Sequence, residues 1–307
     1  MKNWKNRSII SIKNITRKEI EYILDIADKM VEIEKKGSDL AKNKILASLF
    51  YEPSTRTQLS FSSAICKLGG KVIGFSDPEK SSKTKGENLA DTIRSIENYC
   101  DIIVLRHSLE GADRLAAEIS SVPVISAGCG TKEHPTQALL DLFTIKKELG
   151  RIDGLKIGLL GDLKYGRTAK SLTYGLSLFD CELNFISPSS LNMRKEVLSD
   201  LNEKKLNYNE YTDVSKVIDD LDVLYVTRIQ KERFPDPTDY LKVKGSYRID
   251  LPTIKNVKDS FIIMHPLPRI DEIDYEIDNT KHAKYFKQTY YGLCLRMALL
   301  YLILGLA

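Results

Sequence analysis

Short apolar runs alternate along the chain with longer stretches in which apolar residues recur at helical spacing. The first helical stretch runs from Arg17 to about Lys35, and Thr16 with Glu19 forms a capping box that predicts its start. Near-continuous apolar runs, typical of buried strands, follow at 45–51, 71–75, 101–106, 122–126, 155–161, 182–186, 222–227 and 261–264. Such strands, separated by helices, predict parallel sheets that are covered on both faces.

The strands are too many for one small sheet, and a chain of 307 residues corresponds to about two domains. The long helix expected after His134-Pro135 is a natural bridge between two sheets. The apolar segment 292–307 is interrupted by Arg296 and falls short of the ~20 residues that cross a bilayer. We therefore predict a docked C-terminal helix there, and an α/β fold of two domains, each a parallel sheet covered by helices.

Composition narrows the class of protein further. The chain has 46 Lys and Arg against 42 Asp and Glu, and a net charge of +4 gives little reason to expect nucleic-acid binding. Five cysteines, an odd number without a CxxC pair, argue against a disulfide framework and a zinc site. The N-terminal residues are charged throughout and include no apolar stretch of signal-peptide length, so we expect a protein of the reducing cytoplasm.

Polar clusters follow several predicted strands, at the edge of a parallel sheet where ligands bind. After the first strand the chain reads EPSTRT, in which Ser54, Thr55 and Thr57 open a helix and Arg56 adds a guanidinium group. Hydroxyls, free amides and the helix dipole converge at such a start and suit an anion, and an arginine matches two phosphate oxygens. Taken alone, the segment could also be an ordinary serine cap beside an exposed arginine.

Two further clusters lie in the first half of the chain. Arg106 and His107 end the run IIVLRH, for which a solvated strand end is the alternative. His134 and Gln137 belong to the motif HPTQ that opens a helix. Both side chains can donate a hydrogen bond to a small polar substrate, although His134 could also be a capping or buried structural residue.

The second half of the chain supplies cations after its strands. The loop GDLKYGRT lacks the GxGxxG spacing of a dinucleotide site and places Arg167 near a helix start. A later strand leads to Arg228 and Gln230. Two separated arginines at strand ends of one sheet suit a substrate with two carboxylates, although either alone is more often a surface cation.

Two loops complete the set of clusters. The polar segment 77–88, which contains Ser81, Ser82 and Lys85, predicts either an exposed mobile loop or a solvated linker. The motif HPLPR follows the last strand, and its prolines stiffen a turn that can present the carbonyls of Pro266 and Leu267 to a ligand.

Taken together and in order, the motifs STRT, SSKTKGE, LRH, HPTQ, GDLKYGRT, TRIQKER and HPLPR closely resemble the aspartate carbamoyltransferase family, over essentially all 307 residues. The resemblance implies an α/β domain for carbamoyl phosphate, residues 1–134, and one for aspartate, residues 135–286. The C-terminal helix, 287–307, would pack back on the first domain. The expected reaction transfers the carbamoyl group of carbamoyl phosphate to the amino group of L-aspartate, an early step of de novo pyrimidine biosynthesis.

The resemblance also implies roles for individual residues. The phosphate would be held by Ser54, Thr55, Arg56, Thr57 and Arg106. The carbamoyl oxygen would contact Thr57, Arg106 and His134, and the carbamoyl nitrogen would meet Gln137 and the carbonyls of Pro266 and Leu267. Arg167 would take the α-carboxylate of aspartate, and Arg228 with Gln230 the β-carboxylate. Ser81, chosen over Ser82 for its spacing, and Lys85 would reach into a neighbouring subunit, which implies a homotrimer with shared active sites.

The implied chemistry requires no metal or organic cofactor. The residues expected to act on the reacting groups are Arg56, Thr57, Lys85, Arg106 and His134, with His134 as a neutral hydrogen-bond donor. Donors aimed at the carbamoyl oxygen would stabilise the negative charge of a tetrahedral intermediate. No side chain is assigned as general base.

Two alternative functions, and the question of a regulatory partner, stay open at this stage. Ornithine carbamoyltransferases share the phosphate half, but that family carries a cysteine in an HCLP motif where this chain has HPLP. A non-catalytic subunit that senses anions is an alternative from another class. A separate regulatory chain could also bind, and any zinc would then lie on that other polypeptide, since this chain has no zinc-type cysteine cluster.

Overall fold

The computed structural model describes residues 4–76, 86–234 and 236–306. The chain divides into two compact units: unit 1 comprises Met1–Phe143 and Thr289–Ala307, and unit 2 comprises Thr144–Gln288. The boundaries fall inside two helices, α5 (Pro135–Leu149) and α9 (Tyr285–Ile303). The division after residue 134 that the motifs suggest lies ahead of α5, whereas the chain changes its packing partners within that helix.

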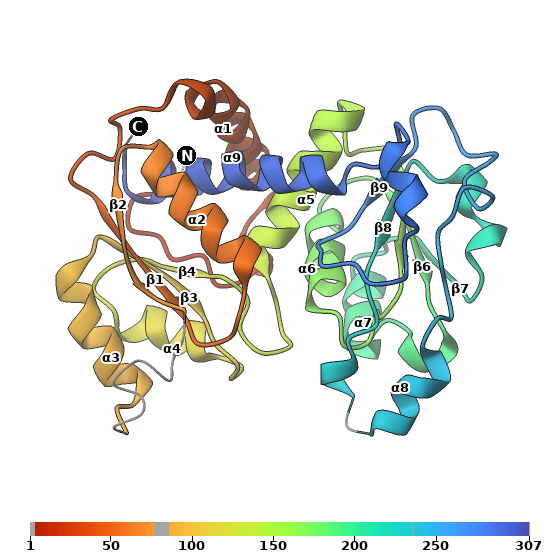
Figure 1. Cartoon of the computed structure of the whole chain (residues 1–307), viewed down its shortest axis with the longest axis horizontal. Helices are drawn as coiled ribbons and strands as arrows, with labels where there is room; N and C mark the ends of the chain where they lie inside the picture. Colours follow the sequence, from red (N-terminus) through yellow and green to blue (C-terminus); the bar gives the residue numbers. More distant parts are fainter. Residues whose placement is uncertain (1–3, 77–85, 235, 307) are drawn as a thin grey trace. The chain divides into compact units, whose positions relative to one another are not determined.

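Unit 1 contains a four-stranded parallel sheet in the order β2-β1-β3-β4 (Figure 1). Its strands are β1 (Ile45–Phe50), β2 (Lys71–Phe75), β3 (Ile102–Arg106) and β4 (Val124–Ser126). All four were predicted from the sequence, and the structure confirms them. The edge strand β2 differs from expectation in its burial, since Val72 and Ile73 are exposed, with relative exposures of 38% and 39%.

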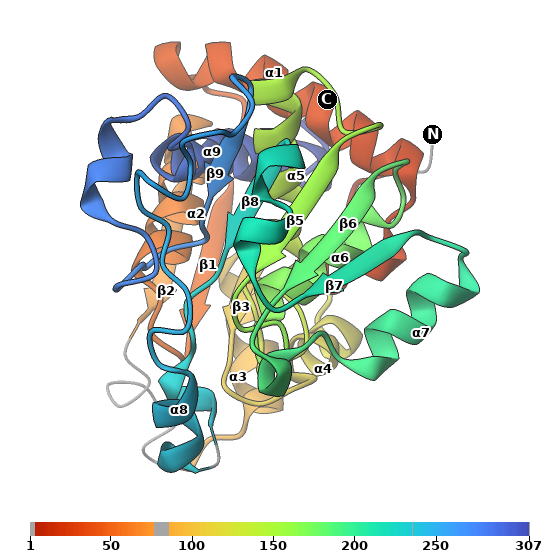
Figure 2. The same cartoon turned by 90° about the vertical axis from the view of Figure 1, so that its right-hand side faces the viewer.

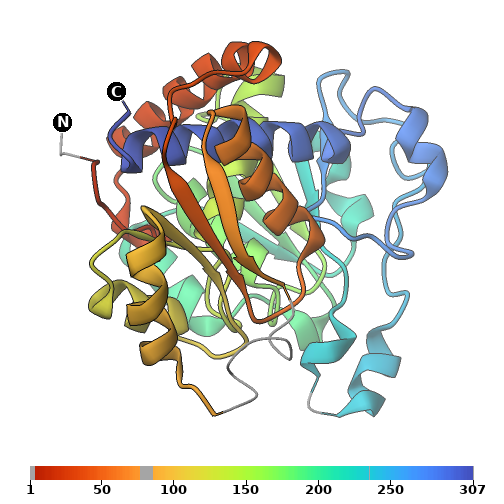
Figure 3. The same cartoon turned by 60° about the vertical axis from the view of Figure 1, so that its left-hand side comes forward.

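The strand order of this sheet reverses at β1: the chain first adds β2 on one side of β1 and then β3 and β4 on the other. This reversal decides which face of the sheet each helix covers. From β1 it passes through α2 (Thr55–Lys67) to β2, and then returns through α3 (Leu89–Ile96) to β3 on the other side of β1. Because such crossovers are right-handed, α2 covers one face while α3 and α4 (Ala112–Ile119) cover the other. In Figure 3, α2 (orange) and α9 (dark blue) lie together on one side of the unit 1 strands.

Unit 2 repeats this architecture with a five-stranded parallel sheet in the order β7-β6-β5-β8-β9 (Figure 2). The strands are β5 (Lys156–Leu160), β6 (Glu182–Ile186), β7 (Tyr208–Tyr211), β8 (Val223–Val226) and β9 (Ile262–Met264). The helices α6 (Arg167–Leu176), α7 (Lys195–Glu203) and α8 (Pro237–Val243) belong to the same unit. The strand β7 was not predicted, because its sequence YNEY has no apolar run and its side chains are half-buried or exposed.

The two terminal helices follow the sequence predictions. In α1 (Arg17–Lys36), Thr16 accepts from the Glu19 backbone amide and Glu19 accepts from the Thr16 amide, which is the expected capping box. The helix α9 is buried along most of its length, and its residues from Thr289 onward belong to unit 1. This confirms a C-terminal helix docked on the first domain. In the part of the chain that the structure describes, no helix is long and apolar enough for a membrane span.

The capping box gives a stability prediction for unit 1. Replacing Thr16 by Ala removes the side-chain acceptor at the start of α1, and we expect a loss of ~1 kcal/mol in the free energy of unfolding. Trp4, the single tryptophan, is buried in unit 1, so its fluorescence during urea unfolding reports this unit. The control Thr16→Ser keeps the acceptor and should unfold like the unchanged protein. An equal loss in both variants would contradict the capping role.

Candidate active site

Each sheet has one point at which its strand order reverses, and a ligand crevice is expected there, beyond the carboxyl ends of the strands. In unit 1 this point lies between β1 and β3, and in unit 2 it lies between β5 and β8. The predicted site residues divide between these two places and two neighbouring segments. Ser54, Thr55, Arg56, Thr57, Arg106, His134 and Gln137 belong to unit 1, and Arg167, Arg228, Gln230, Pro266 and Leu267 belong to unit 2.

In unit 1, the segment after β1 leads directly into the first turn of α2. Ser54 is the N-cap residue, and its side chain makes no capping hydrogen bond to the helix. Its hydroxyl is therefore not used by the helix itself. Thr57 is buried in the same turn, whereas Arg56 is exposed. The free backbone amides and the positive end of the helix dipole make this turn suitable for an anion.

Arg106 lies beside this turn because β1 and β3 are neighbours in register. Phe50 pairs with Arg106, and the Tyr51 amide donates to the Arg106 carbonyl over 2.8 Å. The buried guanidinium donates from Nη1 to the Ala127 carbonyl and from Nη2 to Glu52 Oε1, each over 3.2 Å. These two partners fix the orientation of the side chain. The structure thus brings Arg106 and the start of α2 together at one sheet edge.

His134 and Gln137 are placed by the N-terminus of α5. The His134 carbonyl accepts from the amides of Gln137 and Ala138, over 3.0 and 3.2 Å, and so starts the helix. His134 Nδ1 lies 3.5 Å from Thr136 Oγ1. Gln137 Nε2 donates to Asp141 Oδ1 over 2.9 Å. Both predicted residues are buried.

In unit 2, the loops after β5 and β8 lie against each other. Gly161 has φ +129°, and a Cβ atom there would come within 2.2 Å of the Thr227 carbonyl oxygen. Only glycine permits this close approach. The carboxylate of Asp162 then accepts from the Tyr165 amide over 2.9 Å and from the Gln230 amide over 3.5 Å. Burial raises the pKa of Asp162, and these backbone hydrogen bonds oppose the increase.

The two predicted arginines of unit 2 have different surroundings. Arg167 is buried at the first position of α6. Arg228 is half-buried and forms a two-pronged ion pair with Glu232, in which Nη1 donates to Oε2 over 3.0 Å. The hydrogen bond with Glu232 raises the pKa of Arg228, burial opposes the increase, and the charges of Glu272 and Asp162 add to it. Arg228 therefore stays cationic and would have to share its donors with an incoming carboxylate.

The HPLPR turn is held by a buried histidine. His265 Nδ1 accepts from the Leu267 amide over 2.8 Å, and its Nε2 lies 2.7 Å from Glu272 Oε1. Since Nδ1 is the acceptor, Nε2 carries the proton and donates to the carboxylate. Burial lowers the pKa of His265; burial also acts to raise that of Glu272, but the hydrogen bond from His265 leaves it lowered. A neutral histidine beside an ionised glutamate thus fixes the residues that precede Arg269.

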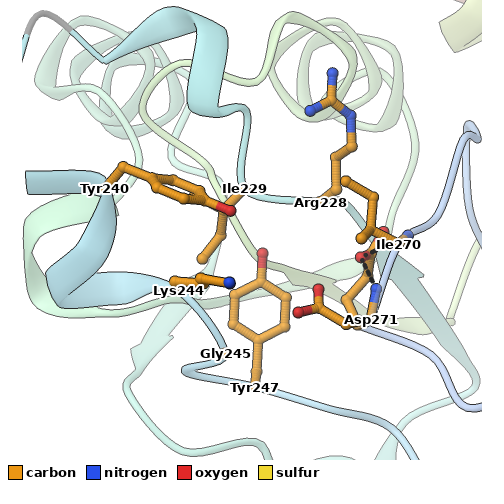
Figure 4. Close-up of a pocket in the computed structure, with 9 residues that line it drawn as sticks. Arg228, Ile229, Tyr240, Lys244, Gly245, Tyr247, Ile270 and Asp271 are labelled. Atoms are coloured by element: carbon orange, nitrogen blue, oxygen red, sulfur yellow. Dashed lines mark hydrogen bonds between the residues drawn. The ribbon is translucent and has the colours of Figure 1, made fainter. Parts of the chain in front are cut away.

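A pocket opens beside Arg228 in unit 2 (Figure 4). It is lined by Arg228, Ile229, Tyr240, Lys244, Gly245, Tyr247, Ile270, Asp271 and Glu272. In Figure 4 the Tyr240 and Tyr247 hydroxyls and the Lys244 ammonium group point toward one another. The Tyr247 hydroxyl donates to the Thr227 carbonyl over 2.7 Å, and burial raises its pKa. Sequence reasoning did not identify Lys244, a second cation near Arg228.

Other functional candidates were also missed. Carboxylates hold the predicted residues in place; four of them, Glu52, Asp141, Asp162 and Glu272, are buried or half-buried, and the fifth, Glu232, is exposed. Glu232 and Asp141 had a local signal, since they follow Arg228 and Gln137 at the i,i+4 spacing of a side-chain pair. Ser81 and Lys85 lie outside the described residues. Across residues 4–76, 86–234 and 236–306, no group of three or more His, Cys, Asp and Glu side chains is arranged to hold a metal ion.

Two family models match the chain. Residues 7–147 match the aspartate/ornithine carbamoyltransferase carbamoyl-P binding domain, and residues 153–303 match the Asp/Orn binding domain of the same family. An aspartate carbamoyltransferase catalytic subunit of Thermococcus kodakarensis is 56% identical over 305 residues, which are 99% of this chain and 98% of that protein. Its counterpart in Methanocaldococcus jannaschii is 56% identical over 297 residues, 96% of both proteins.

Solved structures give the same result. The catalytic subunit of M. jannaschii aspartate transcarbamoylase superposes with a TM-score of 0.89 at 56% identity and covers 96% of both chains. Aspartate transcarbamoylase from Trypanosoma cruzi, in complex with N-(phosphonacetyl)-L-aspartic acid, superposes with a TM-score of 0.94 at 38% identity. That comparison covers 99% of this chain and 98% of the other. On its fold, its two polar strand-end clusters and these similarities, the chain belongs to the aspartate/ornithine carbamoyltransferase family.

Proposed function

We propose that this chain is an aspartate carbamoyltransferase, which transfers the carbamoyl group of carbamoyl phosphate to L-aspartate and releases phosphate. The observation that carries the proposal is the pair of cationic clusters at the reversal points of the two sheets. Unit 1 offers a helix N-terminus beside Arg106, which suits a phosphate, and unit 2 offers Arg167 and Arg228, which suit two carboxylates. The relatives named aspartate carbamoyltransferase support this assignment.

The first substrate binds to unit 1 in this proposal. Ser54, Thr55, Arg56 and Thr57 hold the phosphate with Arg106. Thr57, Arg106 and His134 donate to the carbamoyl oxygen, and Gln137 accepts from the carbamoyl nitrogen, to which the Pro266 and Leu267 carbonyls are also assigned. The T. cruzi relative has been crystallised with carbamoyl phosphate, which supports this substrate.

The second substrate binds to unit 2. Arg167 pairs with the α-carboxylate of aspartate, and Arg228 with Gln230 takes the β-carboxylate. The Lys244 ammonium group, at the pocket beside Arg228, offers a second cation to the same acidic substrate, and Asp271 and Glu272 line that pocket as well. The T. cruzi relative has also been crystallised with carbamoyl phosphate and aspartate together.

The chemical step follows from these placements. The uncharged amine of aspartate attacks the carbamoyl carbon, and negative charge grows on the carbonyl oxygen. Preorganised donors stabilise that charge, and the loss of one such donor typically lowers the rate by ~10²-fold or more. Arg56 and Arg106 stabilise the departing phosphate, which accepts the proton of the amine. Binding both substrates in one orientation lowers the barrier further.

The assembly belongs to the proposal as well. We propose a homotrimer in which Ser81 and Lys85 complete the site of a neighbouring chain. The exposed apolar residues Val72 and Ile73 on the edge strand β2, just before that segment, support a surface that another chain covers. The same proposal places the enzyme in the cytoplasm, where it catalyses an early step of pyrimidine biosynthesis. It is compatible with the binding of a separate regulatory chain.

Phosphate release tests the reaction. The purified chain with carbamoyl phosphate should release phosphate when L-aspartate is added and not when L-ornithine is added. Carbamoyl aspartate should accumulate at the same rate as phosphate. Release with ornithine alone would refute the roles of Arg167, Arg228 and Gln230, and no release with either amino acid would favour a subunit that only senses anions.

Arg228→Leu tests the assignment of the aspartate half. The loss of charged hydrogen bonds worth ~1.5–3 kcal/mol should raise the KM for aspartate roughly 10- to 100-fold. The dissociation constant of carbamoyl phosphate, measured by calorimetry without aspartate, should stay unchanged. Arg248→Leu, which removes an exposed cation of unit 2 paired with Asp274, is the matched control and should leave both constants unchanged. A loss of carbamoyl phosphate binding in Arg228→Leu would contradict the division of roles.

Mixed assembly tests the shared site. Arg56→Ala and Lys85→Ala chains should each be inactive alone. A trimer that contains both has one site with neither substitution, so random mixing at equal amounts should restore roughly a quarter of the full activity. Native mass spectrometry confirms that mixed trimers have formed. Mixed trimers without activity would exclude a site completed by Lys85 of a neighbouring chain.

A further inference from the structure

The buried carboxylate of Asp141 accepts a hydrogen bond from the side chain of Gln137 in unit 1. Gln137 and Asp141 are one helical turn apart on α5, and Gln137 Nε2 donates to Asp141 Oδ1 over 2.9 Å. Gln137 is 7% exposed and Asp141 is fully buried. An ionised carboxylate can only accept hydrogen bonds, so the glutamine must turn its amino group toward it. Asp141 thereby selects one of the two orientations that a side-chain amide can adopt.

The selected orientation matters for the substrate. When Nε2 is directed to Asp141, Oε1 is the atom that Gln137 can offer to a ligand. The amino group of a carbamoyl moiety is a donor and needs an acceptor, whereas a turned glutamine would oppose it with another donor. Two donors facing each other in a buried site remain unsatisfied, which weakens binding.

The charge of Asp141 is compensated by a buried arginine of α9. Arg296 is 4% exposed, and burial lowers its pKa to about 10, while the charge of Asp141 opposes that decrease. The residue is therefore cationic at neutral pH. Its Nη1 donates to Ser60 Oγ over 2.9 Å, and its guanidinium lies 5.1 Å from the centre of the Phe61 ring.

These contacts connect three helices of unit 1. Ser60 and Phe61 belong to α2, whose first turn is the proposed phosphate site, and Asp141 belongs to α5, which begins at the HPTQ motif. Arg296 is held between them by a hydrogen bond to one helix and by electrostatic attraction to the other. A buried cation in this position compensates the carboxylate of Asp141, and the hydrogen bond from Gln137 Nε2 to Asp141 Oδ1 keeps the Gln137 amide in one orientation.

We infer that Asp141, supported by Arg296, is a positioning residue that holds Gln137 Oε1 ready to accept from the carbamoyl amino group and so makes the site prefer a carbamoyl over an acetyl group. The inference rests on the proposed function, because it assumes that Gln137 meets the carbamoyl nitrogen. It adds two residues that contact no substrate. Their effect should depend on whether the substrate carries the amino group.

Acetyl phosphate provides the comparison, since a methyl group replaces the amino group of carbamoyl phosphate. We would measure dissociation constants of carbamoyl phosphate, acetyl phosphate and inorganic phosphate by calorimetry. The unchanged protein should prefer carbamoyl over acetyl phosphate by roughly 10-fold, the effect of about one hydrogen bond. The variant Asp141→Leu/Arg296→Met replaces the buried charges by apolar groups together, so no unpaired charge remains. It should lose the preference, with acetyl phosphate and inorganic phosphate binding changed less than ~2-fold.

Further variants keep the test decisive. Asp141→Asn retains the shape of the side chain but can offer either an acceptor or a donor, so it should show the same pattern with a smaller loss. In the Gln137→Met background, the Asp141→Asn change should leave the ratio of the two affinities unaltered, because Asp141 acts through Gln137. Equal weakening of all three ligands would indicate a merely structural role and would overturn the inference.

The two levels of the argument fail differently. An unchanged protein that binds carbamoyl and acetyl phosphate equally would refute the assumed role of Gln137, and the inference with it. If the unchanged protein prefers carbamoyl phosphate and Asp141→Leu/Arg296→Met keeps the full preference, only the positioning role is refuted, and the proposed function stands.

Discussion

The reversal of chain direction at β1 and at β5 is the constraint on which the rest of the molecule depends. Right-handed crossovers on both sides of the first strand place helices on both faces of each sheet. The carboxyl ends of β1 with β3, and of β5 with β8, then have no helix between them. Each sheet therefore exposes backbone ends at one place, where Arg106 lies in unit 1 and Arg167 and Arg228 lie in unit 2. The close approach of Gly161 to Thr227 shows how tightly the two strand ends of unit 2 are joined.

Carboxylates fix the orientation of side chains and backbone groups at these two strand-end sites. Glu52 orients Arg106, Asp162 binds the backbone of Gln230, and Glu272 fixes the tautomer of His265. Arg106, Gln230 and the turn that His265 holds are groups to which the proposed function assigns substrate contacts, and each of the three carboxylates is itself buried or half-buried. A cationic site that is lined only by cations would repel its own side chains. The acidic residues balance the charge and still leave donors for an anion.

Much of the fold was predictable because most of the parallel strands are apolar along their whole length. The apolar runs that contain Val104 and Leu159 are typical of buried strands. The helices between such runs were predictable from apolar residues that recur at helical spacing. The strand β7 escaped because it lies at a sheet edge and gains its stability from pairing with β6 rather than from burial. The site motifs were visible because each is contiguous in sequence. Their supports were not, since Glu52 and Arg106 are 54 residues apart and only the folded sheet joins them.

The polar character of β7 has a consequence for the behaviour of the protein at high concentration. An unpaired strand edge is a template on which another chain can add a strand. In β7 the two central side chains, Asn209 and Glu210, are exposed, and Asn209 donates back to Asn184 of β6 over 3.1 Å. A charged and amide-bearing edge of only four residues is a poor template for such growth. The β7 edge of the second sheet is thus protected against edge-to-edge aggregation.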